Sequence, residues 1–132
     1  GDIVRFPDWR TGELIRIEHW RTALQLGRIA AHNMAGKDVS YAGVPFFWTD
    51  QFDTMMQYVG YASGWDEIIY KGSPKERNFL AFYVKQDQVL AAAGMKHERE
   101  MAALAELMRL KQTPTPAECR KGLDLLAAMK VI

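Results

Sequence analysis

The chain is poor in the residues that build disulfide or metal sites. It has one cysteine, Cys119, among 132 residues, so no internal disulfide, redox dithiol or thiolate cluster can form. The three histidines, His19, His32 and His97, are scattered without ligand spacing, which predicts that the chain has no metal site. A lone thiol is typical of proteins in reducing compartments, and we expect a cytoplasmic protein.

Long apolar runs and a strong net charge are also missing. No apolar run approaches the roughly 20 residues that a membrane-spanning helix needs. The formal net charge is +1, which gives no general attraction to nucleic acid or to an anionic membrane. The chain begins with Gly1 rather than Met, so we expect a fragment or a processed chain. We therefore predict no membrane segment and no nucleic-acid partner.

The apolar pattern predicts an α+β fold. A period of three to four residues favours a helix over Ile17–Met34, with Gly36 as its stop. Short, aromatic and β-branched segments separated by turn residues predict five strands, and their short links favour an antiparallel sheet. The strands are expected at Val44–Trp48, Met55–Tyr61, Glu67–Lys71, Phe79–Lys85 and Val89–Gly94.

Two helices are expected after the sheet. An apolar stripe through Met101 and Met108 favours the first helix, and Thr115-Pro116-Ala117-Glu118 has the form of a capping box that opens the second. The fold expected is thus a five-stranded antiparallel sheet with two C-terminal helices, preceded by one N-terminal helix.

Two segments carry candidate chemistry, and each has a plainer interpretation. Glu18-His19 has the residue types of an acid–base pair, but adjacent helical residues point apart, which favours a first-turn acid and an exposed imidazole. Phe46-Phe47-Trp48 is followed by Thr-Asp-Gln. In a strand Phe46 and Trp48 face one way and Phe47 the other, which is ordinary for a core and also suits a planar ligand with a polar rim. Glu98 and Glu100 are expected to be a solvated pair favoured by the helix dipole.

Several segments of the chain together resemble one family of flavoproteins. Gly1-Asp2, Ile17-Glu18-His19-Trp20, Gly27–Gly36 and Val44–Gln51 stand here in the order found in the ferredoxin-reductase-like FAD-dependent pyridine nucleotide oxidoreductases. This family includes the putidaredoxin and rubredoxin reductases and the apoptosis-inducing-factor-like proteins. The later strands resemble its C-terminal reductase domain.

The resemblance implies site residues, a cofactor and partners. Asp2 would hydrogen-bond a ribityl hydroxyl of FAD. Glu18, His19 and Trp20 would line the isoalloxazine and nicotinamide region, and Trp48 would pack against the flavin. No residue is assigned a catalytic role. The implied reaction takes a hydride from NAD(P)H to FAD and then passes single electrons to an iron–sulfur protein or domain.

The resemblance also implies a division of the chain. Residues 1–37 would be the C-terminal remnant of an FAD-binding domain, and residues 38–132 the reductase C-terminal, or interface, domain. The chain has no Gly-x-Gly-x-x-Gly fingerprint, so it lacks a site for the ADP halves of FAD and NAD. We therefore expect the isolated chain to bind FAD weakly and to be inactive. The alternative is a non-catalytic interaction or dimerisation module of the same fold, which would form a homodimer.

Overall fold

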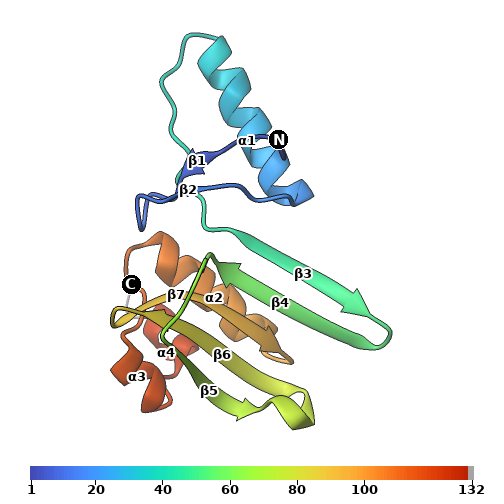
Figure 1. Ribbon diagram of the computed structural model, residues 1–132, viewed down its shortest axis with the longest axis vertical. Helices are drawn as coiled ribbons and strands as arrows, with labels where there is room; N and C mark the ends of the chain where they lie inside the picture. The colour runs from blue at the N-terminus through green and yellow to red at the C-terminus, as the bar shows by residue number, and fades with distance from the viewer. Residues whose placement is uncertain (131–132) are drawn as a thin grey trace. The chain divides into compact units, whose positions relative to one another are not determined.

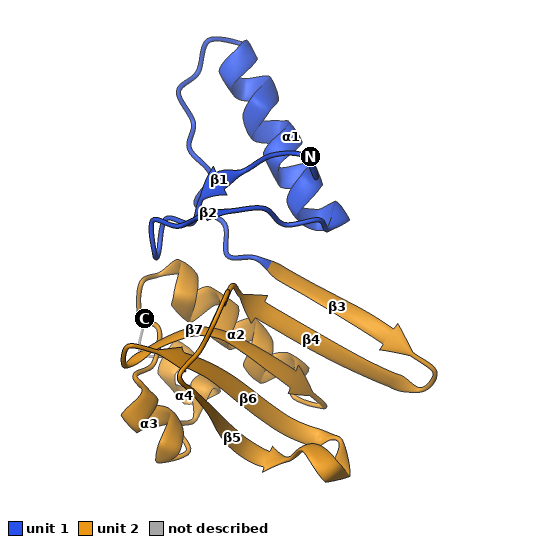
Figure 2. Ribbon diagram, in the orientation of Figure 1, with its two compact units in different colours: residues 1–45 blue, residues 46–132 orange. Residues whose placement is uncertain are grey.

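The computed structural model describes residues 1–130 of the chain (Figure 1). They form two compact units, one spanning Gly1–Pro45 and the other beginning at Phe46 (Figure 2). Within the described residues, none of the helices combines the length and the apolar character that crossing a membrane requires.

The first unit is a small hairpin beside one helix. Its hairpin pairs β1 (Phe6–Pro7) with β2 (Leu14–Ile15), and its helix is α1 (Trp20–Met34). The sequence pattern predicted neither of these two strands, because a strand of two residues is too short to show a period. Phe6, Ile15 and Leu26 are buried, and the Tyr41 ring meets the Phe6 ring edge-on at 4.9 Å between centroids.

Helix α1 leaves its predicted apolar stripe exposed. It begins at Trp20 rather than at Ile17, with His19 as an extended N-cap. The predicted stop at Gly36 is confirmed, since this glycine has φ of +82°. Thr22 and Leu26 face the inside of the unit, whereas Trp20, Leu24 and Met34 are 61%, 49% and 89% exposed. Within the first unit, these three side chains of the stripe are therefore largely uncovered.

The second unit contains the predicted five-stranded antiparallel sheet. Its order is β3-β4-β7-β6-β5, so β3 and β5 are the edge strands. At the β6–β7 turn Gln86 and Asp87 have φ of +49° and +59°, as a tight two-residue hairpin requires. The strands are β3 (Phe46–Gln51), β4 (Thr54–Gly60), β5 (Glu67–Ser73), β6 (Asn78–Lys85) and β7 (Gln88–Met95), with a 3-10 turn η1 (Pro74–Glu76) before β6.

Helix α2 (Glu98–Arg109) covers one face of this sheet by packing on β4 and β7. Gly94 permits the close approach: a Cβ at this position would lie 2.9 Å from side-chain atoms of Leu80 and of Met101. Leu80 and Met101 are fully buried there, as are Leu104 and Met108 farther along α2. The predicted methionine and leucine stripe of this helix is therefore the core of the unit.

The second predicted C-terminal helix is divided into two short ones. They are α3 (Pro116–Arg120), which packs on β5, and α4 (Leu125–Met129), which packs on α2. The capping box at Thr115 is confirmed. The helix stops because Gly122 takes φ of +75°, and Asp124 then caps a new helix by accepting hydrogen bonds from the amides of Leu126 and Ala127. The α+β class and the antiparallel sheet are confirmed.

Candidate functional site

Trp48 lies on edge strand β3, on the face of the sheet that α2 covers. Its cross-strand partner is Gln57, which in turn pairs with Gly94 of β7. Phe46 is on the same face, with its ring centroid 6.2 Å from that of Trp48. Phe47 points to the opposite face and stacks on Tyr58 at 5.2 Å. The predicted alternation is thus confirmed, and it leaves the Trp48 indole half-buried at the edge of the sheet.

A buried acceptor lies directly across from Trp48. The side-chain oxygen Oε1 of Gln57 is inaccessible to solvent and accepts no hydrogen bond from the described residues. Buried polar atoms almost always have a partner, because leaving them unpaired costs their desolvation energy. Because this oxygen has no accessible surface, it marks a tightly packed edge beside Trp48 rather than an open position for a bound group.

The predicted Glu18-His19-Trp20 segment forms the start of α1. His19 has extended backbone angles, and its carbonyl accepts the first helical hydrogen bond, from Ala23 N at 2.9 Å. The His19 and Trp20 rings are in contact, with centroids 5.8 Å apart. Glu18 is exposed and pairs with Arg16. The first turn carries no acidic residue, so the positive end of the helix dipole is not neutralised from within α1.

Asp2 lies in an exposed turn near the chain's start, where the Gly1 carbonyl accepts from Val4 N at 3.1 Å. Of the five predicted site residues, the structure brings His19 and Trp20 into ring contact and sets Glu18 beside them. Asp2 belongs to the same unit as these three, and Trp48 belongs to the other. Their roles toward a flavin stay predictions.

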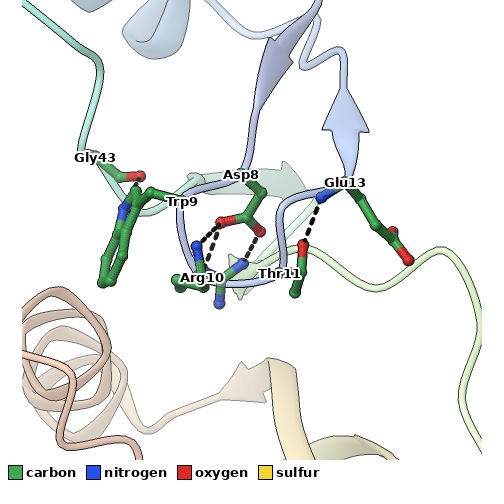
Figure 3. A network of polar contacts seen from close by, with 6 residues as sticks. All are labelled: Asp8, Trp9, Arg10, Thr11, Glu13 and Gly43. Carbon is green, nitrogen blue, oxygen red and sulfur yellow. Dashed lines mark hydrogen bonds and ion pairs between the residues drawn. The ribbon is translucent and has the colours of Figure 1, made fainter.

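The sequence pattern missed a buried ion pair in the first unit. Asp8 is 2% exposed and accepts from the Arg10 backbone N at 3.0 Å, from Nε at 3.1 Å and from Nη2 at 2.6 Å (Figure 3). Asp8 N donates to the Glu13 carbonyl at 2.8 Å, and Thr11 Oγ1 accepts from Glu13 N. This network fixes the β1–β2 turn. In the sequence, nothing about Asp8 and Arg10, which are two positions apart, indicates that they form a buried pair.

A second cluster ties α2 to β5. Lys71 Nζ donates to Glu100 Oε1 at 2.8 Å, and His97 Nδ1 contacts the other carboxylate oxygen. Burial alone would raise the pKa of Glu100, but the hydrogen bonds from His97 and Lys71 outweigh it, so this pKa lies below its usual value. The prediction that Glu100 is simply solvated is wrong. The spacing of His97 and Glu100 could have revealed half of this cluster, because residues three apart meet on a helix.

The arrangement supplies surfaces rather than reacting groups. Within residues 1–130, no group of three His, Cys, Asp or Glu side chains lies close enough together to hold a metal ion. What the residues offer is an aromatic wall at Trp48 beside an unfilled acceptor, and an exposed helix start at Trp20. Features of this kind suit contact with a planar group.

Comparison with known proteins gives several relatives. The chain is 38% identical over 109 residues to human apoptosis-inducing factor 3, covering 82% of this chain and 18% of that protein. It is 36% identical over 91 residues to putidaredoxin reductase of Pseudomonas putida, covering 69% and 22%. The chain thus spans about a fifth of these relatives' length.

Two solved structures are similar to this chain over nearly its whole length. A ferredoxin reductase for the CYP199A2 system of Rhodopseudomonas palustris superposes with a TM-score of 0.85 at 30% identity, covering 98% of this chain and 32% of that one. The covalent putidaredoxin reductase–putidaredoxin complex gives 0.86 at 29% identity, covering 100% and 33%. The family model described as reductase C-terminal matches residues 46–128. This chain therefore belongs to the reductase C-terminal family and has ferredoxin reductases among its relatives.

Proposed function

We propose that the chain is the C-terminal part of an FAD-dependent NAD(P)H oxidoreductase that passes electrons through flavin to an iron–sulfur protein or domain. The observation that carries this proposal is the family match over residues 46–128, combined with the half-buried Trp48 on edge strand β3. Residues 1–37 are then the end of the FAD-binding domain, and residues 38–132 the reductase C-terminal domain.

The proposal gives each site residue a binding role. FAD supplies the redox chemistry when bound: it accepts a hydride and releases single electrons. Trp48 would contact the ring system of the flavin, with Gln57 beside it on β4. The start of α1 offers positive potential where negative charge gathers, with Glu18, His19 and Trp20 lining that region. Asp2 accepts from a ribityl hydroxyl.

The exposed stripe of α1 supports the same proposal. Trp20, Leu24 and Met34 are large apolar side chains left in water by this chain. Burying them at about 25 cal/mol per Å² would contribute several kcal/mol, which a neighbouring domain could supply. In the proposed parent that neighbour is the rest of the FAD-binding domain.

The test is the full-length gene product. It is expected to purify with flavin absorbance, to be reduced by NADH or NADPH, and to pass electrons to an iron–sulfur protein such as putidaredoxin. The isolated 132-residue chain is expected to bind FAD at least 100-fold more weakly, because the pyrophosphate and adenine contacts are missing. A full-length product without flavin would refute the proposal.

A matched pair of variants tests the role of Trp48. In the full-length protein, Trp48→Ala is expected to weaken FAD binding or slow flavin reduction at least tenfold, since it removes the ring that stacks on the flavin. Trp65→Ala removes an indole that is 52% exposed on the loop before β5 and is expected to change neither quantity. Equal effects of the two substitutions would remove Trp48 from the site.

The second candidate function is an interaction or dimerisation module, and the exposed α1 stripe favours it too. Sedimentation of the 132-residue chain separates the two proposals. A homodimer that Leu24→Glu dissociates supports the module, whereas a monomer that needs upstream domains to cover α1 supports the reductase fragment.

A further inference from the structure

The β3–β4 hairpin ends in a two-stranded arm, which we define as residues 49–56. Strand β4 pairs with β7 only through Gln57–Gly60, while its pairing with β3 continues to Thr54. Within the described residues, the arm is therefore hydrogen-bonded as a strand pair only to itself, and Figure 2 shows its end extending past β7. A two-stranded ribbon is marginally stable alone in water, so an arm of this kind is expected to rest on something.

Phe52 stands at the tip of the arm and is fully exposed, at 104% of its reference area. Its φ is +54°, a left-handed conformation that a bulky side chain rarely takes and that turns usually give to glycine or asparagine. The chain thus holds an aromatic ring in water on an unfavourable backbone. The tight turn requires this conformation, as it does at Gln86 and Asp87, so the feature that marks Phe52 as an anchor-type residue is its full exposure.

The charge of the arm restricts what it can meet. Asp50 and Asp53 flank Phe52 and are both exposed, and the arm contains no lysine or arginine. An acidic tip is repelled by phosphate groups, nucleic acid and anionic membranes. An aromatic ring between two carboxylates suits an apolar pocket with basic side chains at its rim, since the ring is buried while the carboxylates remain paired.

The position of Trp48 then suggests where this pocket lies. Phe52 follows Trp48 by four positions, which at about 3.3 Å per residue places the tip roughly 13 Å farther along the strand. If Trp48 rests on the flavin, the tip reaches past it to the protein that holds the flavin. Under the proposed function, most of that protein belongs to the rest of the polypeptide, because the chain covers only 18% to 33% of the relatives and solved structures compared above.

We propose that Phe52 is an anchor by which the arm docks into an apolar, basic-rimmed pocket on the dinucleotide-binding part of the same polypeptide. The docking rests on the proposed function and extends it, because it fixes the strand that carries Trp48. Arg77, whose Nη1 donates to Thr54 Oγ1 at 3.4 Å, braces the arm from the β5–β6 turn.

Site-directed photocrosslinking in the full-length protein tests the docking. The photoreactive p-benzoylphenylalanine replaces Phe52 in one sample and Tyr70 in the control, since Tyr70 is 53% exposed on the opposite edge strand. Illumination at position 52 is expected to join the arm to a segment upstream of Gly1 within one polypeptide, as peptide mapping by mass spectrometry would show. Position 70 is expected to give no such product.

Three results would overturn the docking: no crosslink from position 52, a crosslink to a second copy or to another protein, or the same upstream crosslink from position 70. Phe52→Ala gives an independent measurement. It is expected to increase the rate of proteolytic cleavage within the arm at least tenfold, and an unchanged rate would count against the anchor.

Failure of the docking and failure of the proposed function are distinguishable. A full-length protein that carries flavin but gives no crosslink from position 52 removes the docking alone. A full-length protein without flavin removes the proposed function, and the docking with it.

Discussion

Glu100→Gln is the substitution that tests the link between α2 and β5 most directly. The carboxylate of Glu100 accepts from Lys71 Nζ at 2.8 Å and contacts His97 Nδ1 with its other oxygen. The amide keeps the shape of the side chain, loses the charge and can still accept one hydrogen bond. The variant therefore isolates the electrostatic part of the cluster.

The magnitude follows from the exposure of the two partners. The Glu100 side chain is 20% exposed and that of Lys71 is 34% exposed, so the pair lies between surface and interior. Exposed pairs contribute about 0–1 kcal/mol, whereas removing one partner of a fully buried pair costs about 3–5 kcal/mol. Because solvent screens Lys71, we expect a loss of about 1–2 kcal/mol at pH 7, or a Tm lower by about 4–8 °C.

The loss should depend on pH with a defined sign. Since the folded state lowers the pKa of Glu100 below its ordinary value of 4.5, this carboxylate stabilises the fold above that value. The contribution disappears as pH falls through the lowered pKa of the folded state. Urea unfolding of both proteins at pH 7 and at about pH 3 is expected to show a smaller difference between them at pH 3 than at pH 7.

Glu98→Gln is the matched control, because Glu98 is exposed in the same helical turn. It is expected to change the free energy of unfolding by a few tenths of a kcal/mol through the helix dipole alone. A Glu100→Gln loss that is equal at both pH values, or no larger than that of Glu98→Gln, would refute the reasoning. Lys71→Met completes a double-mutant cycle, whose coupling energy should account for most of the effect.

Three other predictions concern the second unit. Gly94→Ala adds a methyl 2.9 Å from buried side chains and is expected to destabilise the unit by about 1–3 kcal/mol in urea unfolding, whereas Gly64→Ala, with nothing within 4 Å, is expected to be nearly neutral. Thr115→Ala removes the cap of α3 and should cost about 1 kcal/mol by the same assay. Burial raises the pKa of Cys119 to about 11, so native protein at pH 8 should react with iodoacetamide far more slowly than urea-unfolded protein.

The elements that the sequence predicted well are those whose signal is local. Strand alternation depends on neighbouring residues, and the two-residue link Gln86-Asp87 permits only an antiparallel hairpin. The boundary between α3 and α4 was missed because Gly122 takes a left-handed conformation in the middle of an apolar pattern that would otherwise continue. Only the backbone conformation shows where such a helix stops.

The predictions that failed or were missed depend on residues distant in the sequence. In the sequence, Glu100 has the features of a solvated acid in the first turn of a helix. In the fold, the pairing of β5 places Lys71, 29 residues away in the sequence, beside it. The unfilled acceptor of Gln57 is visible only once the strand register sets it opposite Trp48. The exposed stripe of α1 is a similar case. The apolar period predicted the helix, but a period does not show which face of the helix other residues bury.

By itself, the sequence determined the α+β class, the antiparallel sheet and the family to which the chain belongs, because periodicity and short motifs are carried by residues near one another. Only the tertiary structure decided which side chains are buried together, since the order β3-β4-β7-β6-β5 brings distant residues into contact. It was this packing that gave Phe52 its exposed place at the end of an arm, and that left Trp48 beside a buried acceptor for which residues 1–130 supply no donor.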